Sequence, residues 1–309
     1  MGEFYREYSD YLSSRFDGKL QKISINTGTP CPNRDGTLGT GGCVYCNNAA
    51  FVPGYAEGAC DVATQLQRGI AFFSRKYPQM RYLAYFQAQT ATNAASGTFM
   101  RQVRQAVVYP GVAGIVIGTR PDCMPDSLLD NLARINSGEM PVIIEYGAES
   151  SHDDTLRLIN RCHTWQQTVD TVNRTAAAGI DVGLHLIMGL PGENRIMQLQ
   201  TVDRVNGLPV KILKLHQLQI IRNTALADIY HRQQLGQATE FPPVTLYGAD
   251  DYAALCVEVV HRLRPDIAID RFVSSAPESL RIAPSWGLKN HEFTALLKKK
   301  LACTNSTPR

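Results

Sequence analysis

Short apolar runs alternate with longer segments of helical periodicity along most of the chain. Within 61–76, Leu66, Ile70 and Phe73 recur at the spacing that places side chains on one face of a helix. The expected helices cover 61–76, 98–108, 125–135, 153–178 and 194–205. The expected strands cover 22–28, 82–87, 114–119, 141–147, 180–193 with its closing turn, and 210–220. This alternation predicts a parallel sheet with helices packed outside it.

The number of repeating units indicates the fold class. Six strand and helix units are too few for a closed barrel of eight, so we expect an α/β fold, a partial (β/α)6 TIM-like barrel with a C-terminal α/β extension. The predicted parts are an N-terminal helix at 1–20, a core barrel at 21–220 and a cap at 221–309 over the open side. The cap is expected to contain helices at 247–263 and 290–301 and a strand at 266–273.

Composition narrows the class of protein further. The chain has 309 residues, of which 44% are hydrophobic and 19% charged, and this balance is typical of a globular protein. The net charge of +3 is too small to indicate a dedicated nucleic-acid domain. No apolar run is long enough to span a bilayer, and the first residues lack the apolar core of a signal peptide. We therefore expect a cytoplasmic protein without membrane contact, whose eight cysteines are thiols or metal ligands.

Three cysteines lie in one glycine-rich loop. Cys31, Cys43 and Cys46 follow the first predicted strand, which ends at Gly28. In a parallel barrel, the active site is built from loops at the carboxyl ends of the strands. The loop glycines at 36, 39, 41 and 42 allow the backbone to wrap closely around a bulky group. Three thiolates leave one iron of a four-iron cluster open for a substrate or cofactor.

Two alternatives use the same cysteines without radical chemistry. Cys60 would complete a four-cysteine zinc site that stabilises an RNA- or protein-binding module without catalysis. Cys60 lacks a Cys-x-x-Cys partner, and this weakens the zinc interpretation. A plain electron carrier is the other alternative, but small carriers rarely need so long a chain. The remaining cysteines are isolated and are interpreted as buried thiols.

The cysteine loop resembles the radical S-adenosylmethionine superfamily. The usual motif of that superfamily is Cys-x3-Cys-x2-Cys with an aromatic residue before the last cysteine, a position held here by Tyr45. The first gap is eleven residues instead of three, and CPNRDG…GGCVYC is similar to the YhcC-like subfamily. That subfamily is related to the radical domain of the elongator catalytic subunit and to the oxygen-independent coproporphyrinogen oxidases. Further matching segments are AYFQAQTATNA (84–94), IGTRPDC (117–123), EYGAES (145–150), LRLINRCH (156–163), HLIMGLPGE (185–193), KLHQLQ (214–219) and IAPSWGLKNHEF (282–293).

The resemblance implies an enzyme with two cofactors. Cys31, Cys43 and Cys46 would hold a [4Fe-4S] cluster, and its open iron would bind S-adenosylmethionine. One electron, delivered by an external flavodoxin- or ferredoxin-like reductant, would cleave S-adenosylmethionine to a 5′-deoxyadenosyl radical that takes hydrogen from a substrate. The substrate is not implied, because the relatives act on RNA or on tetrapyrroles. Nothing in the sequence supports RNA as a partner.

The resemblance also implies which residues contact S-adenosylmethionine. Gln87 takes the position that meets the methionine amino group, and Arg161 matches an arginine that meets the methionine carboxylate. Glu149 stands where relatives carry Gln. An ionised Glu only accepts hydrogen bonds, so we expect it to pair with Arg161 or to face the ribose hydroxyls. Gly189 and Gly192 would allow close approach of the adenine. Plainer interpretations exist. Gln87 could be an ordinary amide at a strand end, Arg161 could pair with the carbonyls at the end of its helix, and Gly189 and Gly192 could belong to an ordinary strand-to-helix turn.

Other polar residues at strand ends are less specific. His185 and His216 lie on the fifth and sixth predicted strands and are more often satisfied core or pocket histidines than catalytic bases. Arg120 and Asp122 follow the third strand and are expected either to line the pocket or to pair with each other.

Overall fold

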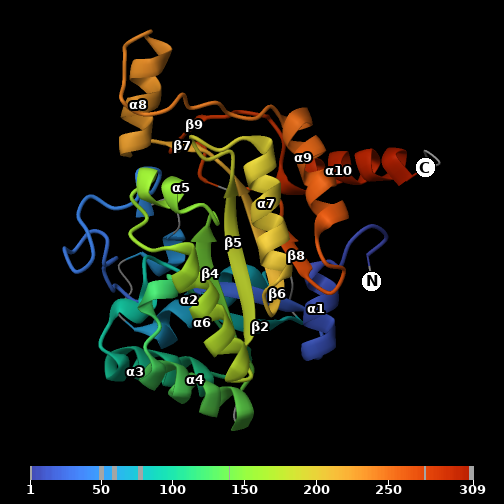
Figure 1. Cartoon of the computed structure of the whole chain (residues 1–309). Helices are drawn as coiled ribbons and strands as arrows, with labels where there is room; N and C mark the ends of the chain where they lie inside the picture. The colour runs from blue at the N-terminus through green and yellow to red at the C-terminus, as the bar shows by residue number, and fades with distance from the viewer. Residues whose placement is uncertain are drawn as a thin grey trace.

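The computed structural model describes residues 2–48, 52–57, 61–75, 79–138, 140–274 and 276–305. Its centre is a seven-stranded parallel sheet, curled into a partial barrel, in the order β1-β2-β3-β4-β5-β6-β8 (Figure 1). The strands are β1 (Leu20–Ile25), β2 (Arg81–Phe86), β3 (Val112–Thr119), β4 (Val142–Glu149), β5 (Asp181–Met188), β6 (Val210–Gln217) and β8 (Ala268–Arg271). The predicted fold class, a partial barrel with a C-terminal extension, is confirmed.

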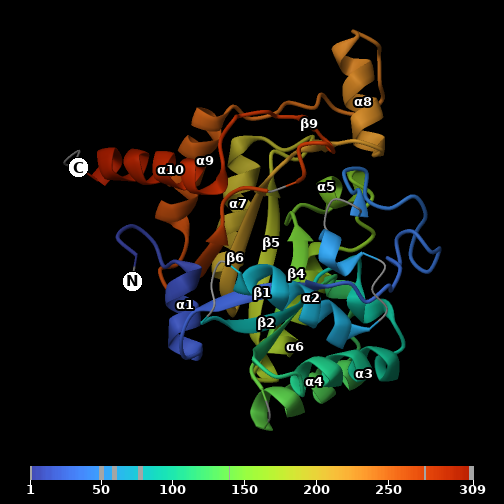
Figure 2. The same cartoon turned by 180° about the vertical axis from the view of Figure 1, so that it is seen from behind.

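Helices connect successive strands and cover the outside of the sheet (Figures 1 and 2). They are α2 (Val62–Ser74), α3 (Ser96–Val107), α4 (Asp126–Gly138), α5 (Asp153–Leu158), α6 (Trp165–Ala177) and α7 (Arg195–Asn206). Side chains of Asp61, Thr164 and Asn194 cap α2, α6 and α7 by accepting backbone N–H bonds. Short 3-10 helices η2 (Gly54–Ala56), η3 (Ala91–Asn93) and η4 (Pro121–Cys123) lie in the loops. No helix in the described ranges combines the length and apolar character of a membrane span.

The seventh strand comes from the part of the chain expected to form the cap. Ile212 and Leu213 of β6 pair in parallel with Ala268 and Ile269 of β8, so the predicted strand at 266–273 extends the barrel sheet. Helix α9 (Ala249–Arg262) makes the crossover that a parallel pair requires. The sequence pattern predicts the strand but not its pairing partner. The pairing depends on where helix α9 packs, and the local pattern carries no information about that. The boundary at residue 220 stays a prediction.

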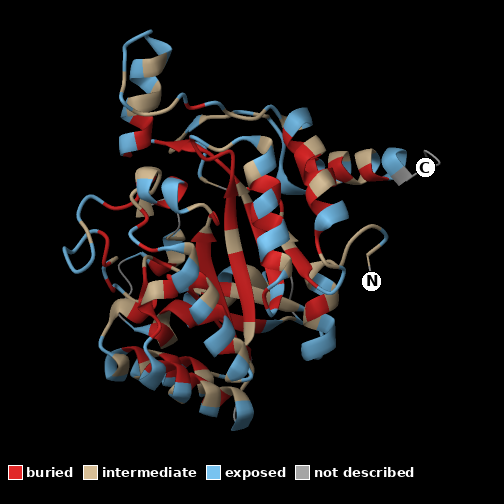
Figure 3. Cartoon of the chain, viewed as in Figure 1, coloured by how far each residue is buried: buried red, intermediate tan, exposed pale blue. Residues whose placement is uncertain are grey.

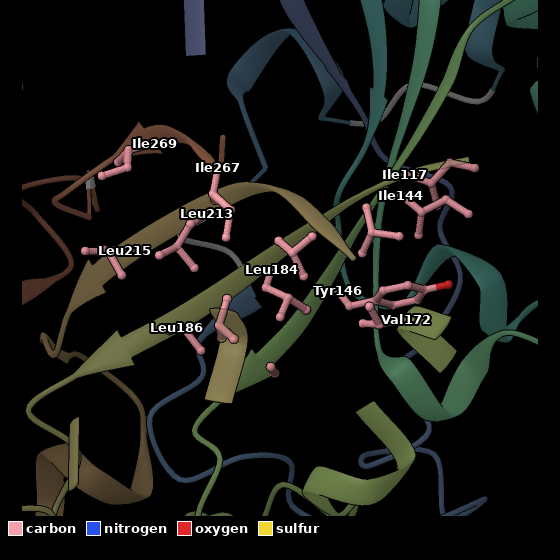
Figure 4. Packing of buried hydrophobic residues seen from close by; sticks show 14 of the residues in the cluster. Ile117, Ile144, Tyr146, Val172, Leu184, Leu186, Leu213, Leu215, Ile267 and Ile269 are labelled. Atoms are coloured by element: carbon pink, nitrogen blue, oxygen red, sulfur yellow. The ribbon is translucent and has the colours of Figure 1, made fainter. Parts of the chain in front are cut away.

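Two apolar layers lie on either side of the sheet. Strand residues alternate between the faces, so neighbours such as Ile143 and Ile144 belong to different layers. The outer layer packs between sheet and helices, where Tyr146 and Leu184 lie near Val172 of α6 (Figures 3 and 4). Because both faces of the sheet are covered, the strands are buried at the centre of the molecule. The exposed residues lie on the outward faces of the helices (Figure 3).

The inner layer is covered by the N-terminal helix α1 (Tyr8–Arg15). Tyr11 of α1 and Phe16 just after it pack on apolar side chains inside the barrel, including Leu83, Val116 and Ile212. The Tyr11 hydroxyl donates to Asp181, the first residue of β5, at 2.7 Å. Helix α1 therefore fills the barrel at the amino ends of the strands.

The chain beyond β6 builds a small structure at the opposite end of the barrel. Strands β7 (Ile220–Ile221) and β9 (Arg281–Ala283) form an antiparallel ladder, and α8 (Ala225–Gln234) projects beside it (Figure 1). Helix α10 (Asn290–Asn305) packs on α9. This C-terminal part brings residues 217–219 of β6 and its extension close to residues 281–293.

Candidate cofactor site

The cysteine loop lies at the carboxyl end of β1 and is held by internal turns. The backbone N–H groups of Arg34 and Asp35 donate to Cys31 O at 2.8 and 3.1 Å. The Cys46 N–H donates to Cys43 O at 3.0 Å. Each end of the loop is thus a tight turn that contains cysteine, which fixes the backbone beside the thiols.

A second segment anchors the loop from outside. The Val44 N–H donates to Ile159 O at 3.1 Å, and the Asn160 amide donates to Gly42 O at 2.9 Å. Asn33, whose side chain is fully buried, donates back to Asn160 O. Asn160 and Cys162 adopt left-handed backbone conformations with φ of 53° and 60°, which end α5 and turn the chain towards the loop. The loop and the turn after α5 therefore form one hydrogen-bonded unit.

The three thiols are differently exposed. Cys43 is buried, whereas Cys31 and Cys46 are half-buried. Burial, together with the neighbouring Cys43, raises the pKa of Cys46 to about 11. The Arg161 guanidinium Nη1 lies 3.7 Å from Cys43 Sγ, and the Arg34 side chain donates to Cys46 O at 2.5 Å. Two cations thus lie against the loop, where they would stabilise thiolates.

Across the described ranges, no three His, Cys, Asp or Glu side chains converge on one point as the ligands of a single metal ion would. A structural zinc site takes four ligands, so Cys31, Cys43 and Cys46 alone would leave a zinc ion one ligand short. An iron–sulfur cluster takes each thiolate on a different iron, so its ligands are spread further apart. Cys60, the fourth ligand of the zinc alternative, lies outside the described residues.

The Arg161 side chain lies beside the loop and contacts several groups through hydrogen bonds and an ion pair. Its Nη2 donates to Gly147 O at 2.6 Å and lies 3.3 Å from Glu149 Oε1, and its Nε donates to His163 at 3.1 Å. A Cβ at position 147 would lie 2.6 Å from the guanidinium, so a side chain there would displace Arg161 from this position. The pairing of Glu149 with Arg161, one of two arrangements expected from the sequence, is present. Burial and the nearby guanidinium lower the pKa of His163 to about 3, so its ring is neutral and Nε2 can accept.

A second buried arginine lies behind Arg161. Arg120 pairs with Asp122 through two bonds of 2.9 and 2.7 Å, so the predicted pairing of these residues is present. It also donates from Nη2 to Arg161 O at 2.8 Å. Its Nη1 is buried and has no hydrogen-bond partner in the described part of the chain. A buried donor without a partner is costly, and this marks a place for an acceptor that the protein does not supply.

The other candidate contacts lie at neighbouring strand ends. Gln87, just after β2, donates to Ser24 Oγ of β1 at 2.9 Å. Gly189, just after β5, has φ of 88°, and its N–H donates to Gln198 at 3.0 Å. The ring of Tyr247 lies so close that a Cβ at 189 would stand 3.2 Å from it. Gly192 has φ of 84° and lies near Leu158. Of the predicted residues, the structure brings Cys43, Glu149 and Arg161 into direct proximity.

A charged layer inside the barrel was not predicted from the sequence. Glu145 of β4 accepts from Lys22 at 2.8 Å, from Lys214 at 3.2 Å and from Tyr85 at 2.7 Å. Asp270 completes the layer, 3.0 Å from Lys22. Charged residues inside otherwise apolar strands, as in VIIEYG and VKILKLH, are the signal that could have revealed it.

Burial near this charged layer also sets the protonation state of His185 and His216. Burial and the Lys214 ammonium lower the pKa of His185, although its Nε2 lies 2.9 Å from Glu145. Burial, with the neighbouring His185, lowers the pKa of His216 well below its usual range. Both rings are therefore neutral at pH 7. Burial lowers the pKa of Lys214 to about 8.

A parallel partial barrel with three cysteines in the loop after its first strand defines the class of radical S-adenosylmethionine enzymes. Family models agree: the Radical SAM superfamily matches residues 31–205, and the Radical_SAM C-terminal domain matches residues 210–302. The chain belongs to the radical SAM superfamily and is a radical SAM enzyme. Enzymes of this superfamily use a [4Fe-4S] cluster and S-adenosylmethionine.

Named relatives are similar over most of the chain. Protein YhcC of Escherichia coli K12 is 35% identical over 89% of this chain and 85% of its own length. YtqA of Bacillus subtilis is 32% identical over 96% of this chain and 89% of its own length. The solved structure of archaeal Elp3 from Methanocaldococcus infernus, lacking residues 1–46, has a TM-score of 0.67 at 13% identity and covers 94% of this chain and 65% of that one. The predicted family is confirmed, and the Elp3 likeness supports the same fold.

Proposed function

We propose that Cys31, Cys43 and Cys46 hold a [4Fe-4S] cluster with one open iron, and that the enzyme cleaves S-adenosylmethionine reductively and takes hydrogen from a further substrate. The observation that carries this proposal is the single anchored loop that bears all three thiols at the active end of the barrel. When bound, the cluster would supply the electron that splits S-adenosylmethionine into methionine and a 5′-deoxyadenosyl radical.

The residues around the loop fit this cluster. Three soft thiolates are the ligand set that iron–sulfur clusters take. A cluster bound by thiolates is negatively charged, and Arg161 and Arg34 lie against the loop to balance that charge. Because Cys46 has a raised pKa in the free protein, metal binding must displace its proton.

Arg120 and Arg161 are suited to the methionine end of S-adenosylmethionine. The free Nη1 of Arg120 is a donor that a carboxylate would satisfy. Glu149, Gly147 and His163 hold the Arg161 guanidinium, so this cation is oriented before the cofactor arrives. Gln87 is proposed to meet the amino group through its amide oxygen, which is the acceptor of this side chain. Gly189 and Gly192 are proposed to meet the adenine through backbone groups.

The proposal has two consequences outside the site. Reduction requires an external one-electron donor of the flavodoxin or ferredoxin type. We also propose a cytoplasmic location, because thiols that must bind iron are kept reduced there.

Iron content of cysteine variants tests the assignment. Cys31→Ala, Cys43→Ala and Cys46→Ala should each lose most of the iron and the absorbance near 400 nm after anaerobic reconstitution. Cys60→Ala and Cys303→Ala are matched controls and should keep both. Equal loss in Cys60→Ala would show that a fourth cysteine takes part, and colourless metal would support zinc.

A further inference from the structure

A second open site lies in the C-terminal part of the molecule. A cavity of about 510 Å³ opens where Gln217 ends β6 and where Ser274 follows β8. This volume lies within the range of about 300–1,000 Å³ that is usual for small-molecule sites. The cavity is also lined by 276–278, 281, 284, 286–291 and 293, which include most of the IAPSWGLKNHEF segment. The proposed cofactor site does not use these residues.

One polar side chain in this cavity has no partner. Gln219 is only 8% exposed and lines the cavity, immediately before β7. Its side-chain amide makes no hydrogen bond within the described ranges. The amide atoms of Gln219 are open to this cavity, so its adjacent donor and acceptor are available for a ligand. A carboxamide can pair with the edge of a nucleobase through these two atoms.

Cationic side chains line the same cavity. They are Arg281 and Lys289, and the lining contains one acid, Glu278. Glu278 is 3.8 Å from Arg281, but its side chain is 93% exposed and does not neutralise the interior. Helix α10 begins at Asn290 beside the cavity, and the Glu292 carboxylate accepts from the Lys289 N–H at 2.6 Å, so the end of this helix is already capped and the charge on the cavity comes from the two side-chain cations. These groups favour a phosphate.

Flat apolar side chains also line the cavity. Trp286 lines the cavity and is fixed by its bond from Nε1 to Tyr247 O at 3.0 Å and by stacking on Phe293. Pro277 and Pro284 add further flat surfaces. Rigid aromatic and proline faces suit the stacking of a base.

We propose that this cavity binds one nucleotide unit of the substrate, with its base at Gln219 and Trp286 and its phosphate at Arg281 and Lys289. The role of this unit as substrate rests on the proposed radical function. The cavity opens at the same end of the barrel as the cysteine loop, and His216 reaches it through its bond to Ser274 Oγ at 3.2 Å. A free nucleotide and a nucleotide within RNA share this chemistry.

Equilibrium dialysis of the reconstituted full-length enzyme, with saturating S-adenosylmethionine to fill the cofactor site, tests the proposal. The probes are the four nucleoside monophosphates, the matching nucleosides, inorganic phosphate and a short mixed-sequence oligoribonucleotide. At least one monophosphate or the oligonucleotide should bind at least about tenfold more tightly than phosphate or nucleoside, since base and phosphate both contribute. Binding of monophosphates indicates a free substrate, and binding of the oligonucleotide alone indicates RNA.

Variants locate the binding. Gln219→Leu, Arg281→Gln and Lys289→Gln should each weaken binding about 5- to 20-fold, as expected for one lost polar contact to a ligand. Lys300→Gln, a matched charge loss on α10 at a residue paired with Asp250, should change it less than about twofold. Equal weakening in Lys300→Gln, no effect of Arg281→Gln and Lys289→Gln, or no binding of any nucleotide would overturn the proposal. Because binding is measured without turnover, this result is independent of whether 5′-deoxyadenosine is formed.

Discussion

At the scale of single residues, Arg161 connects the cysteine loop to the end of β4. Its three nitrogens reach Cys43, Gly147 with Glu149, and His163. A guanidinium so fixed loses little entropy when it binds a carboxylate. The sequence singled out Arg161 and Glu149, because both lie in segments with a family resemblance, and their pairing was one of the two arrangements expected. It could not predict the free Nη1 of Arg120, since an unpaired atom depends on the packing of three separate loops.

Replacing Arg161 with Ala should weaken S-adenosylmethionine binding by about 1.5–3 kcal/mol, the usual range for losing a hydrogen bond to a charged group. This corresponds to an increase in the dissociation constant of about 10- to 150-fold. Iron content should remain, because no cysteine changes. Titration calorimetry on the reconstituted protein measures the affinity, and the thermal unfolding temperature reports whether the variant is folded.

Two comparisons sharpen this test. Glu149→Gln should have a milder effect, since it keeps an acceptor for the guanidinium. Arg174→Ala removes an arginine whose ion pair with Asp126 is largely exposed and should leave the affinity unchanged. Unchanged affinity in Arg161→Ala would mean that Arg161 only closes the turn after α5.

At the scale of elements, strand β4 has two different faces. Ile144 and Tyr146 face the outer apolar layer, whereas Glu145 points into the barrel between Lys22 and Lys214. Apolar periodicity predicted the strand but not this layer, because the charges that neutralise one another come from four strands distant in sequence. The same limit applies to β8, whose apolar run was recognised while its place in the sheet was not.

Glu145→Gln should lower the free energy of unfolding by about 3–5 kcal/mol near pH 7, because it leaves buried ammonium groups without their shared carboxylate. Burial alone would raise the pKa of Glu145, but Lys214 and Lys22 hold it well below 4.5 in the folded protein. The stabilisation is therefore present above pH 4.5 and is lost as the pH falls below it. Denaturant titration across pH 3–7 should show a weaker acid dependence in Glu145→Gln than in the wild type.

Glu258→Gln is the matched control, since Glu258 pairs with Arg195 at a half-exposed position. It should change the free energy of unfolding by no more than about 1 kcal/mol. If Glu145→Gln is as stable as this control, the ion pairs of Glu145 inside the barrel do not stabilise the fold.

At the scale of the whole molecule, helix α1 and the C-terminal part close the barrel in different ways. Helix α1 fills the amino end through Tyr11 and Phe16, and Lys298 of α10 pairs with Glu7 at 2.7 Å. The two ends of the described chain therefore meet at the edge of the barrel near β8. The sequence predicted both flanking parts, but it could not show that they contact each other.

Deleting residues 1–18 should expose the inner apolar layer, including Leu83 and Ile212. We expect binding of a hydrophobic dye and a lower unfolding temperature, because apolar area returns to water. Deleting residues 303–309 instead should have little effect, since Cys303 near the end of α10 is exposed; the prediction that the isolated cysteines are buried is wrong for Cys303 and Cys162. A truncated protein as stable as the full chain would show that α1 is only an appendage.

The central claim is that the anchored cysteine loop makes this chain an enzyme that splits S-adenosylmethionine. The most direct measurement is the release of 5′-deoxyadenosine by the iron-loaded, dithionite-reduced protein, followed by chromatography. Slow release without added substrate is predicted, together with its loss in Cys43→Ala and its retention in Cys303→Ala. A fully iron-loaded, reduced protein that forms no 5′-deoxyadenosine, with or without cell extract, would contradict the account.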